Sequence, residues 1–234
     1  MKRLFVCLLA LAFSVSFLHA QEEDEVSLPK PKSSNDQFVV NLVTNLMNPP
    51  LENITSKPYA SLGAEIYSYS PLIGKKSKVG LAMGVGVGTF NYNMNAFPMR
   101  DSLDHTVFTR LPDSLQYKKS KITITYWDVP VEIRVRSNPS AKGNAFKFAA
   151  GFKFGVMLSN HYKYRGDSWT EDNRQVKFKT YNIDNMMRIR YGAYARIGYG
   201  KFTVMGTYYL TPLFEKGQGP ESTVLSLGLS FLII

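Results

Sequence analysis

The sequence predicts an all-β fold: an eight-stranded antiparallel up-and-down β-barrel that crosses a membrane. Three observations support this prediction. From residue 38 onward, apolar and polar residues alternate with a period of two, which is typical of β-strands. No segment after residue 20 approaches the ~18 consecutive apolar residues of a transmembrane helix. The alternating runs set large apolar residues against small ones, which suits lipid outside and a narrow lumen inside.

The N-terminus has the features of an export signal. Residues 1–20 combine a positively charged start, an uncharged apolar run and a small final residue, so a secretory signal peptide is expected. Cleavage is expected between Ala20 and Gln21. Cys7 lies within this signal, so the exported chain has no cysteine for a disulfide or a metal site. Residues 21–37 are polar and without period, which predicts a disordered periplasmic leader.

Residues 38–234 are expected to form one outer-membrane barrel domain. Short connections follow the second, fourth and sixth runs, whereas the third and fifth are followed by long loops, residues 94–117 and 161–186. Outer-membrane barrels alternate short periplasmic turns and longer outer loops in this way, and an even strand count returns both chain ends to the periplasm. The expected strands cover residues 38–47, 58–69, 78–93, 118–136, 144–160, 187–199, 201–211 and 222–233.

The composition of the strand faces indicates which side meets lipid. In residues 78–93 one face carries valine, leucine and methionine, and the other carries glycine and alanine. A soluble barrel would need polar residues on its water-exposed face, so the apolar faces are expected to contact lipid. Aromatic residues near strand ends are expected to form interfacial girdles. These residues are Tyr67, Tyr69, Tyr126, Trp127, Tyr199, Phe202, Tyr208 and Tyr209.

One segment resembles a known family. Residues 126–133, YWDVPVEI, resemble the mid-barrel strand of the PorT-like outer-membrane β-barrel family of Bacteroidetes, and residues 148–155 and 225–229 are similar to that family too. The resemblance implies an outer-membrane location, and some members assist protein secretion. Several strands exceed the ~9–11 residues needed to cross a membrane, so their surplus is expected to project as a sheet with exposed edges. This feature resembles OmpX-like barrels, a group implicated in surface adhesion or defence.

Charged residues fall on the inward faces of the expected strands. Such charges need partners, because they are withdrawn from lipid and largely from water. We expect a polar network that plugs the lumen; an anion-selective pore is the alternative. The expected network consists of Glu65, Asp128, Glu132, Arg134, Lys153, Arg190 and Arg196. Four further bases are expected in the lumen: Arg136, Lys147, Arg188 and Lys201.

The outer loops hold the remaining candidates. His105 and His161 have no neighbours at a spacing typical of a nucleophile and its base, so catalysis is not expected. No motif for a cofactor or a metal is found. Ser102 and Ser114 each stand between Asp and Leu, which resembles the Asp-Ser/Thr-aliphatic sequon for O-glycosylation in Bacteroidetes. Ordinary turn chemistry is the alternative explanation of this tripeptide.

The sequence thus predicts a monomeric outer-membrane barrel with a structural or surface-binding role through its two long outer loops. Membrane lipid and an extracellular protein or glycan are the expected partners. The net charge of +10 comes from bases scattered along the chain rather than clustered, so nucleic acid is not expected. An accessory of protein secretion, a narrow anion-preferring channel and a rim enzyme are the alternatives.

Overall fold

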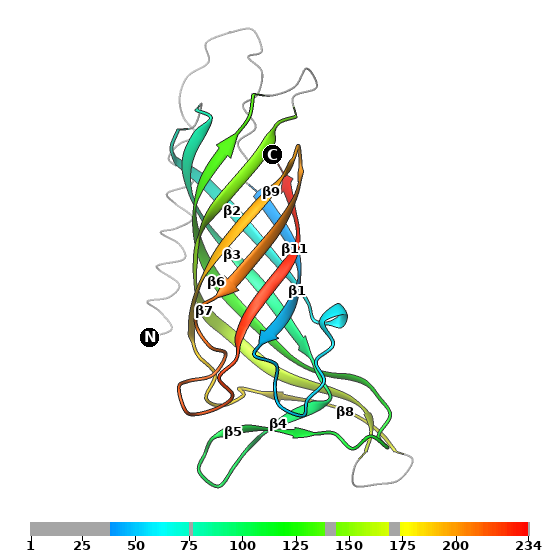
Figure 1. Cartoon of the computed structure of the whole chain (residues 1–234). Coiled ribbons are helices and arrows are strands. Elements are labelled where there is room, and N and C mark those ends of the chain that lie inside the picture. The colour runs from blue at the N-terminus through cyan, green and yellow to red at the C-terminus, as the bar shows by residue number, and fades with distance from the viewer. Residues whose placement is uncertain (1–37, 75–76, 139–143, 169–173, 234) are drawn as a thin grey trace, which may run out of the picture. The chain divides into compact units, whose positions relative to one another are not determined.

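The computed structural model describes residues 38–74, 77–138, 144–168 and 174–233; the expected signal, cleavage position and leader lie outside these ranges. Within them, eight antiparallel strands close into a barrel, which confirms the predicted fold (Figure 1). Barrel strands that follow one another along the chain are paired, and β1 pairs with β11 to close the wall. They are β1 (Phe38–Asn48), β2 (Leu62–Ile73), β3 (Val79–Asn93), β6 (Tyr117–Arg136), β7 (Phe146–Asp167), β9 (Ile189–Tyr199), β10 (Phe202–Tyr209) and β11 (Thr223–Ile233).

The start of β2 differs more from the sequence prediction than that of any other barrel strand. β2 starts at Leu62 rather than at residue 58, because Pro58–Ala60 ahead of it form a short 3-10 helix, η1. Proline favours this start, since its ring fixes φ and it has no N–H to offer a strand ladder. In the described part of the chain, no helix has the length and apolar character needed to cross a membrane.

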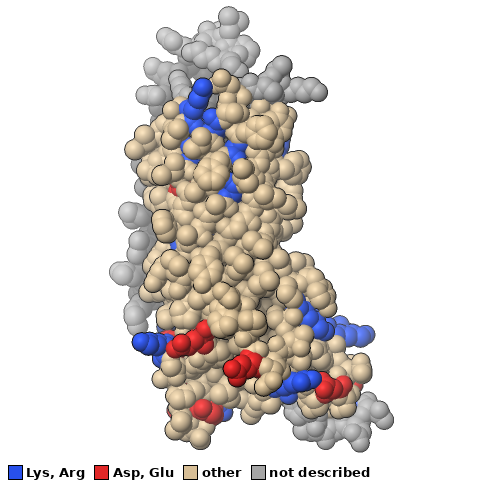
Figure 2. All heavy atoms as spheres, viewed as in Figure 1, with Lys and Arg blue, Asp and Glu red and all other residues tan. Residues whose placement is uncertain are grey.

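On β3 the two faces divide as the sequence predicted, with the large apolar residues outward and the small ones inward. On β7, Phe152 and Phe154 are exposed, whereas Lys153 between them is buried. Figure 2 shows the result as a broad middle band with almost no charged side chain on the viewed face. We call this outward-facing band the apolar belt; on β7 it runs from Phe146 to Leu158. Such a surface is unfavourable in water and matches the lipid-facing band of membrane barrels.

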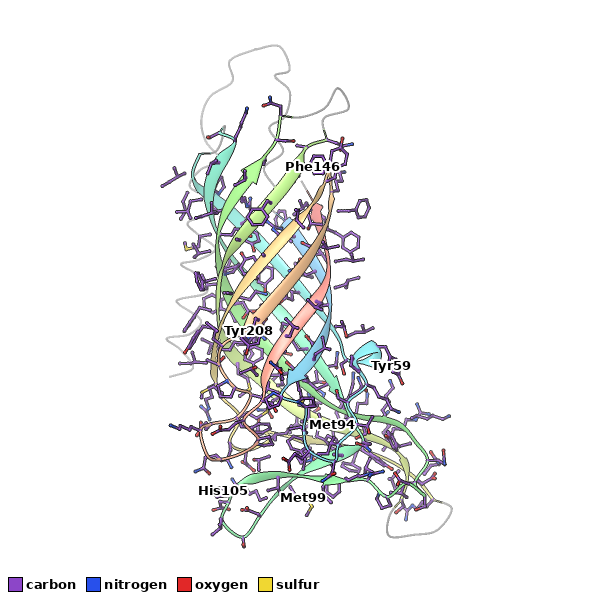
Figure 3. All side chains as sticks on the ribbon, viewed as in Figure 1. Tyr59, Met94, Met99, His105, Phe146 and Tyr208 are labelled. Atoms are coloured by element: carbon purple, nitrogen blue, oxygen red, sulfur yellow. The ribbon has the colours of Figure 1, made fainter. Side chains whose placement is uncertain are left out.

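The aromatic girdles contain only half of the residues expected in them. Trp127, Tyr199, Phe202 and Tyr208 face outward, as predicted. Figure 3 shows Phe146 and Tyr208 projecting from the wall at different heights. The prediction was wrong for the other four, Tyr67, Tyr69, Tyr126 and Tyr209, which are buried in the lumen. Tyrosine suits this interior because its ring fills space while its hydroxyl can bond to the polar groups there.

We call the end of the barrel with the long connections the loop end, and the opposite end, with the short turns, the turn end. Further strands lie at the loop end. β7 reaches Asp167, beyond its predicted end at residue 160, because β8 (Gln175–Tyr181) pairs with this extension. β4 (Ala96–Arg100) and β5 (Thr106–Arg110) form a separate hairpin (Figure 1). We call β4, β5, β8 and the parts of β6 and β7 beyond the apolar belt the platform.

One hydrophobic core joins the lumen to the platform. Phe90 and Tyr126 of the barrel belong to the same buried cluster as Ala96 and Tyr164 of the platform. The Tyr164 ring lies 5.5 Å from the ring of Phe178 on β8, so the added strand packs through its inward face. The platform is therefore an ordered extension of the barrel wall.

Candidate functional site

The middle of the lumen is built around Glu65, which alternation on β2 points inward. Lys153 Nζ from β7 lies 2.6 Å from Glu65 Oε1, and both side chains are 1% exposed. Asn41 Nδ2 donates to the other carboxylate oxygen at 2.8 Å, and the Tyr67 hydroxyl lies 3.0 Å from Oε1. The carboxylate is thus paired and hydrogen-bonded, as a buried charge must be.

A second pair lies beside the first. Arg190 contacts both carboxylate oxygens of Asp128, with Nη2 at 2.8 Å from Oδ2 and Nε at 3.2 Å from Oδ1. The guanidinium carbon also lies 3.7 Å from the ring centre of Tyr126, a cation–π contact. Gly155 makes room for this pair, because a Cβ atom at that position would overlap Asp128 Oδ1. The glycines that the sequence placed on the inward faces thus admit charged neighbours.

The third acidic residue, Glu132, lies nearer the turn end. Its Oε1 accepts hydrogen bonds from both Arg134 and Arg196, and Tyr194 donates to Oε2 at 2.8 Å. The hollow beside Arg134 and Arg196 has a volume of about 10 Å³. Such a hollow has room for about one water molecule.

The structure therefore brings all seven residues of the expected network together, in three groups that each contain one carboxylate. Of the other bases expected in the lumen, Arg136 and Lys147 are half-buried beside the small hollow at the turn end. Arg188 and Lys201 are exposed, so their expected place in the lumen was wrong. Both lie in connections outside the regular strands, where alternation does not set direction.

The two histidines lie in the platform and not in one site. His105 Nδ1 is 3.5 Å from Asp101 Oδ2 in the turn between β4 and β5 (Figure 3). Backbone N–H groups of His105 and Leu103 donate to Asp101, and these bonds hold the pKa of its carboxyl below the usual value. Asp101 thus organises the turn. His161 was expected in a loop but lies within β7, paired with Tyr181 of β8.

Among the described residues, no group of three or more side chains could hold a metal ion. Ser102 and Ser114, the expected glycosylation positions, are both exposed in connections at the loop end. Each is accessible to a modifying enzyme.

Sequence reasoning missed a cluster of bases on the outward face of the platform. Bases that are far apart in the sequence stand side by side, because β6, β7 and β8 pair in register. One row across the three strands is Lys119, Arg165 and Lys177; the next is Lys121, Lys163 and Lys179. The statement that the bases are scattered rather than clustered was therefore wrong for the folded chain.

Comparison with known proteins identifies a family and shows a weak likeness to a solved structure. A family model described as outer membrane protein beta-barrel domain matches residues 41–215. Among solved structures, the attachment invasion locus protein Ail of Yersinia pestis, in complex with the heparin analogue sucrose octasulfate, aligns with a TM-score of 0.30 and 11% identity. The alignment covers 83% of this chain and 95% of that chain. No curated protein matches the chain.

Proposed function

This chain belongs to the outer membrane protein β-barrel domain family, and from that premise we propose that it is a non-conducting barrel whose platform binds partners at the cell surface. The platform is the observation that carries this proposal. A barrel that served only as a membrane anchor would need strands no longer than the apolar belt. Here β6 and β7 continue well past it, and β8 and the β4–β5 hairpin are added.

The orientation of the barrel supports a surface role. Both described ends of the barrel, Phe38 and Ile233, are paired with each other at the turn end. Outer-membrane barrels hold their chain ends and short turns in the periplasm, which directs the loop end to the outside. The exposed side chains of the platform would then be available to an extracellular protein or glycan.

The lumen network argues against the channel alternative. Three carboxylates and four bases fill the cross-section together with tyrosines, and the network leaves little space beside Arg134 and Arg196. A conducting pore needs a continuous wet path, whereas an eight-stranded lumen is just wide enough for side chains. We propose that the network acts as a plug and that the chain acts without a cofactor and without catalysis.

A trimmed barrel tests the surface-binding proposal. Short turns would replace the β4–β5 hairpin and β8, and cells carrying this variant would be compared with cells carrying the full chain. We expect the trimmed barrel to reach the outer membrane and to migrate faster on gels when unboiled, while attachment of the cells to surfaces is lost. Attachment equal to that of the full chain would overturn the proposal.

The alternative function is that of a secretion accessory. Some members of the PorT-like family, which residues 126–133 resemble, have this role. Such a protein would act through the turn end and the leader, residues 21–37. Deleting the leader and measuring secreted protein separates the two functions, because surface binding needs only the loop end. Normal attachment with defective secretion would favour the PorT-like alternative.

A further inference from the structure

The outward face of the platform carries a grid of six bases. The rows Lys119–Arg165–Lys177 and Lys121–Lys163–Lys179 lie next to each other, because successive outward positions on a strand are two residues apart. The inward face of the same sheet holds Tyr162, Tyr164 and Phe178, which pack in the core. The core thus fixes which face is free, but it does not require bases there.

Holding these bases together is unfavourable for the fold. Like charges directly opposite each other on neighbouring strands are destabilising. Burial and the surrounding positive charges of Lys119 and Lys179 lower the pKa of Lys163. Among the described residues, no carboxylate lies within ion-pair distance of the six. Lys121 Nζ donates to Asn91 Oδ1 at 2.6 Å, but this neutral amide leaves its charge uncompensated.

Protection of a sheet edge explains only part of the grid. Lysines on edge strands discourage pairing with other chains, and β8 is such an edge. Lys121 and Lys163 lie on β6 and β7, which have neighbours on both sides at this point. These two bases offer no edge protection, so they indicate a negatively charged ligand.

The position of the grid above the apolar belt limits the ligand. Lys163 follows Leu158, the last belt residue of β7, by five positions. With a strand rise of ~3.3 Å and a tilt near 45°, this places Lys163 on the order of 12 Å above the belt. The headgroup layer of a bilayer is only ~5–8 Å thick on each side. The grid therefore lies beyond the lipid phosphates.

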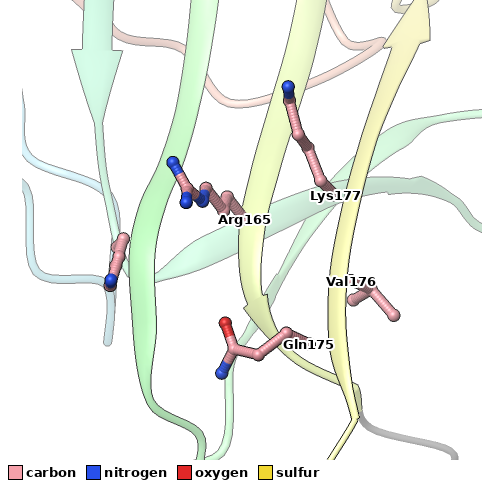
Figure 4. A pocket seen from close by; sticks show the side chains of 5 residues that line it. Arg165, Gln175, Val176 and Lys177 are labelled. Carbon is pink, nitrogen blue, oxygen red and sulfur yellow. The ribbon is translucent and has the colours of Figure 1, made fainter.

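The chemistry of the face separates two kinds of polyanion. Single-stranded nucleic acid is bound through several aromatic rings on which successive bases stack. Among the described residues of this face, Tyr181 is the one exposed Phe, Tyr or Trp side chain. The half-buried His161 lies beside it. Next to the grid, an open hollow of about 540 Å³ is lined by Lys118, Arg165, Gln175, Val176 and Lys177 (Figure 4). The bases suit the acidic groups of a sugar chain, while the Gln175 amide nitrogen already donates to Asp167.

We propose that the grid of six bases binds a polyanionic polysaccharide. This inference rests on the proposed surface-binding function and names the class of partner. The negative groups of the sugar chain, carboxylate, sulfate or phosphate ester, would lie between the two rows. Binding offsets the repulsion among the bases, which explains why the chain tolerates it.

The test uses the full chain in a non-ionic detergent and fluorescent dextran sulfate as the probe. A variant with Lys163→Gln, Lys177→Gln and Lys179→Gln removes three positive charges from the grid. A control variant with Lys78→Gln, Lys201→Gln and Lys216→Gln removes three exposed positive charges elsewhere. We expect the grid variant to bind about tenfold more weakly, since each exposed ion pair contributes modestly. The control should bind like the unmodified chain, and uncharged dextran should not bind.

Four results would overturn the inference. Equal losses in both variants would mean that net charge alone attracts the probe. Unchanged binding by the grid variant would place the ligand elsewhere. Single-stranded DNA bound as tightly as dextran sulfate would mean that the face does not select sugar chains. If the grid variant loses the probe while cell attachment persists, the proposed function stands and the polysaccharide is not its partner.

Discussion

The buried pair of Lys153 and Glu65 allows the plug to be tested quantitatively. At their separation of 2.6 Å, Coulomb's law with an effective dielectric constant near 20 gives an attraction of roughly 6 kcal/mol. Loss of hydration costs several kcal/mol for each buried ion, so the net contribution of the intact pair is small. Replacing only Lys153 by methionine leaves the Glu65 carboxylate buried without its cation. We expect this variant to lose about 3–5 kcal/mol in free energy of unfolding.

The assay is urea unfolding of the full chain in phospholipid vesicles, followed by tryptophan fluorescence and by gel migration without boiling. The double variant Glu65→Gln with Lys153→Met removes both charges, and Asn41 and Tyr67 remain as hydrogen-bond partners for the new amide. We expect it to recover most of the stability that Lys153→Met loses, because no unpaired charge is left. A loss below about 1 kcal/mol in the single variant would refute the reasoning, since such a value is typical of water-exposed pairs.

Four other predictions follow from the fold. Phe152→Arg places a charge in the apolar belt and should cost about 2–4 kcal/mol in the same vesicle assay; a smaller effect would mean that this face is not in lipid. Gly155→Leu should abolish the compact form on unboiled gels, because its side chain would displace the neighbouring carboxylate; normal migration would contradict this. Burial and neighbouring lysines lower the pKa of His161, so the stability that its neutral form contributes is present at pH 7 and is lost as the pH falls below about 6.5. His161→Gln should therefore flatten the fall in unfolding midpoint between pH 7 and pH 5, and an equally steep fall would refute this. When the protein is purified from its native host, its intact mass should exceed the mass calculated from its sequence, and Ser102→Ala and Ser114→Ala should each reduce that excess. A mass equal to the calculated one would rule out glycosylation.

The wall of the barrel was predictable because alternation has only two phases. A charged or small residue between two large apolar ones, as at Lys153 between Phe152 and Phe154, fixes the direction of the side chains on that strand as far as the bulge near Leu158. The same logic placed the network residues in the lumen. The girdle prediction for Tyr67 went against this logic, because Tyr67 lies two positions from Glu65 on β2 and therefore shares its inward direction.

The partners within the lumen could not be predicted, since they depend on the register of distant strands. Glu65 and Lys153 are 88 positions apart, and a shift of two residues on either strand would have paired the carboxylate differently. The sequence could state only that buried acids need bases.

The grid of bases was missed for a related reason. Its members occur in the sequence as three Lys-x-Lys or Lys-x-Arg doublets, near residues 119, 163 and 177. Each doublet marks one face of a strand, which is a usable signal. The doublets meet because β7 continues past residue 160 and β8 pairs with it, and a loop was expected there. Without that strand pair, nothing in the sequence aligns the rows.

Labelling of single cysteines in intact cells tests the central claim, that the platform faces the outside of the cell, most directly. With Cys7 replaced by alanine, Ser102→Cys places one thiol at the loop end and Asn138→Cys places one at the turn end; both positions are exposed. We predict that a maleimide unable to cross membranes labels the first variant in intact cells and the second only after the cells are opened. Labelling of Asn138→Cys in intact cells, with Ser102→Cys protected, would contradict the account.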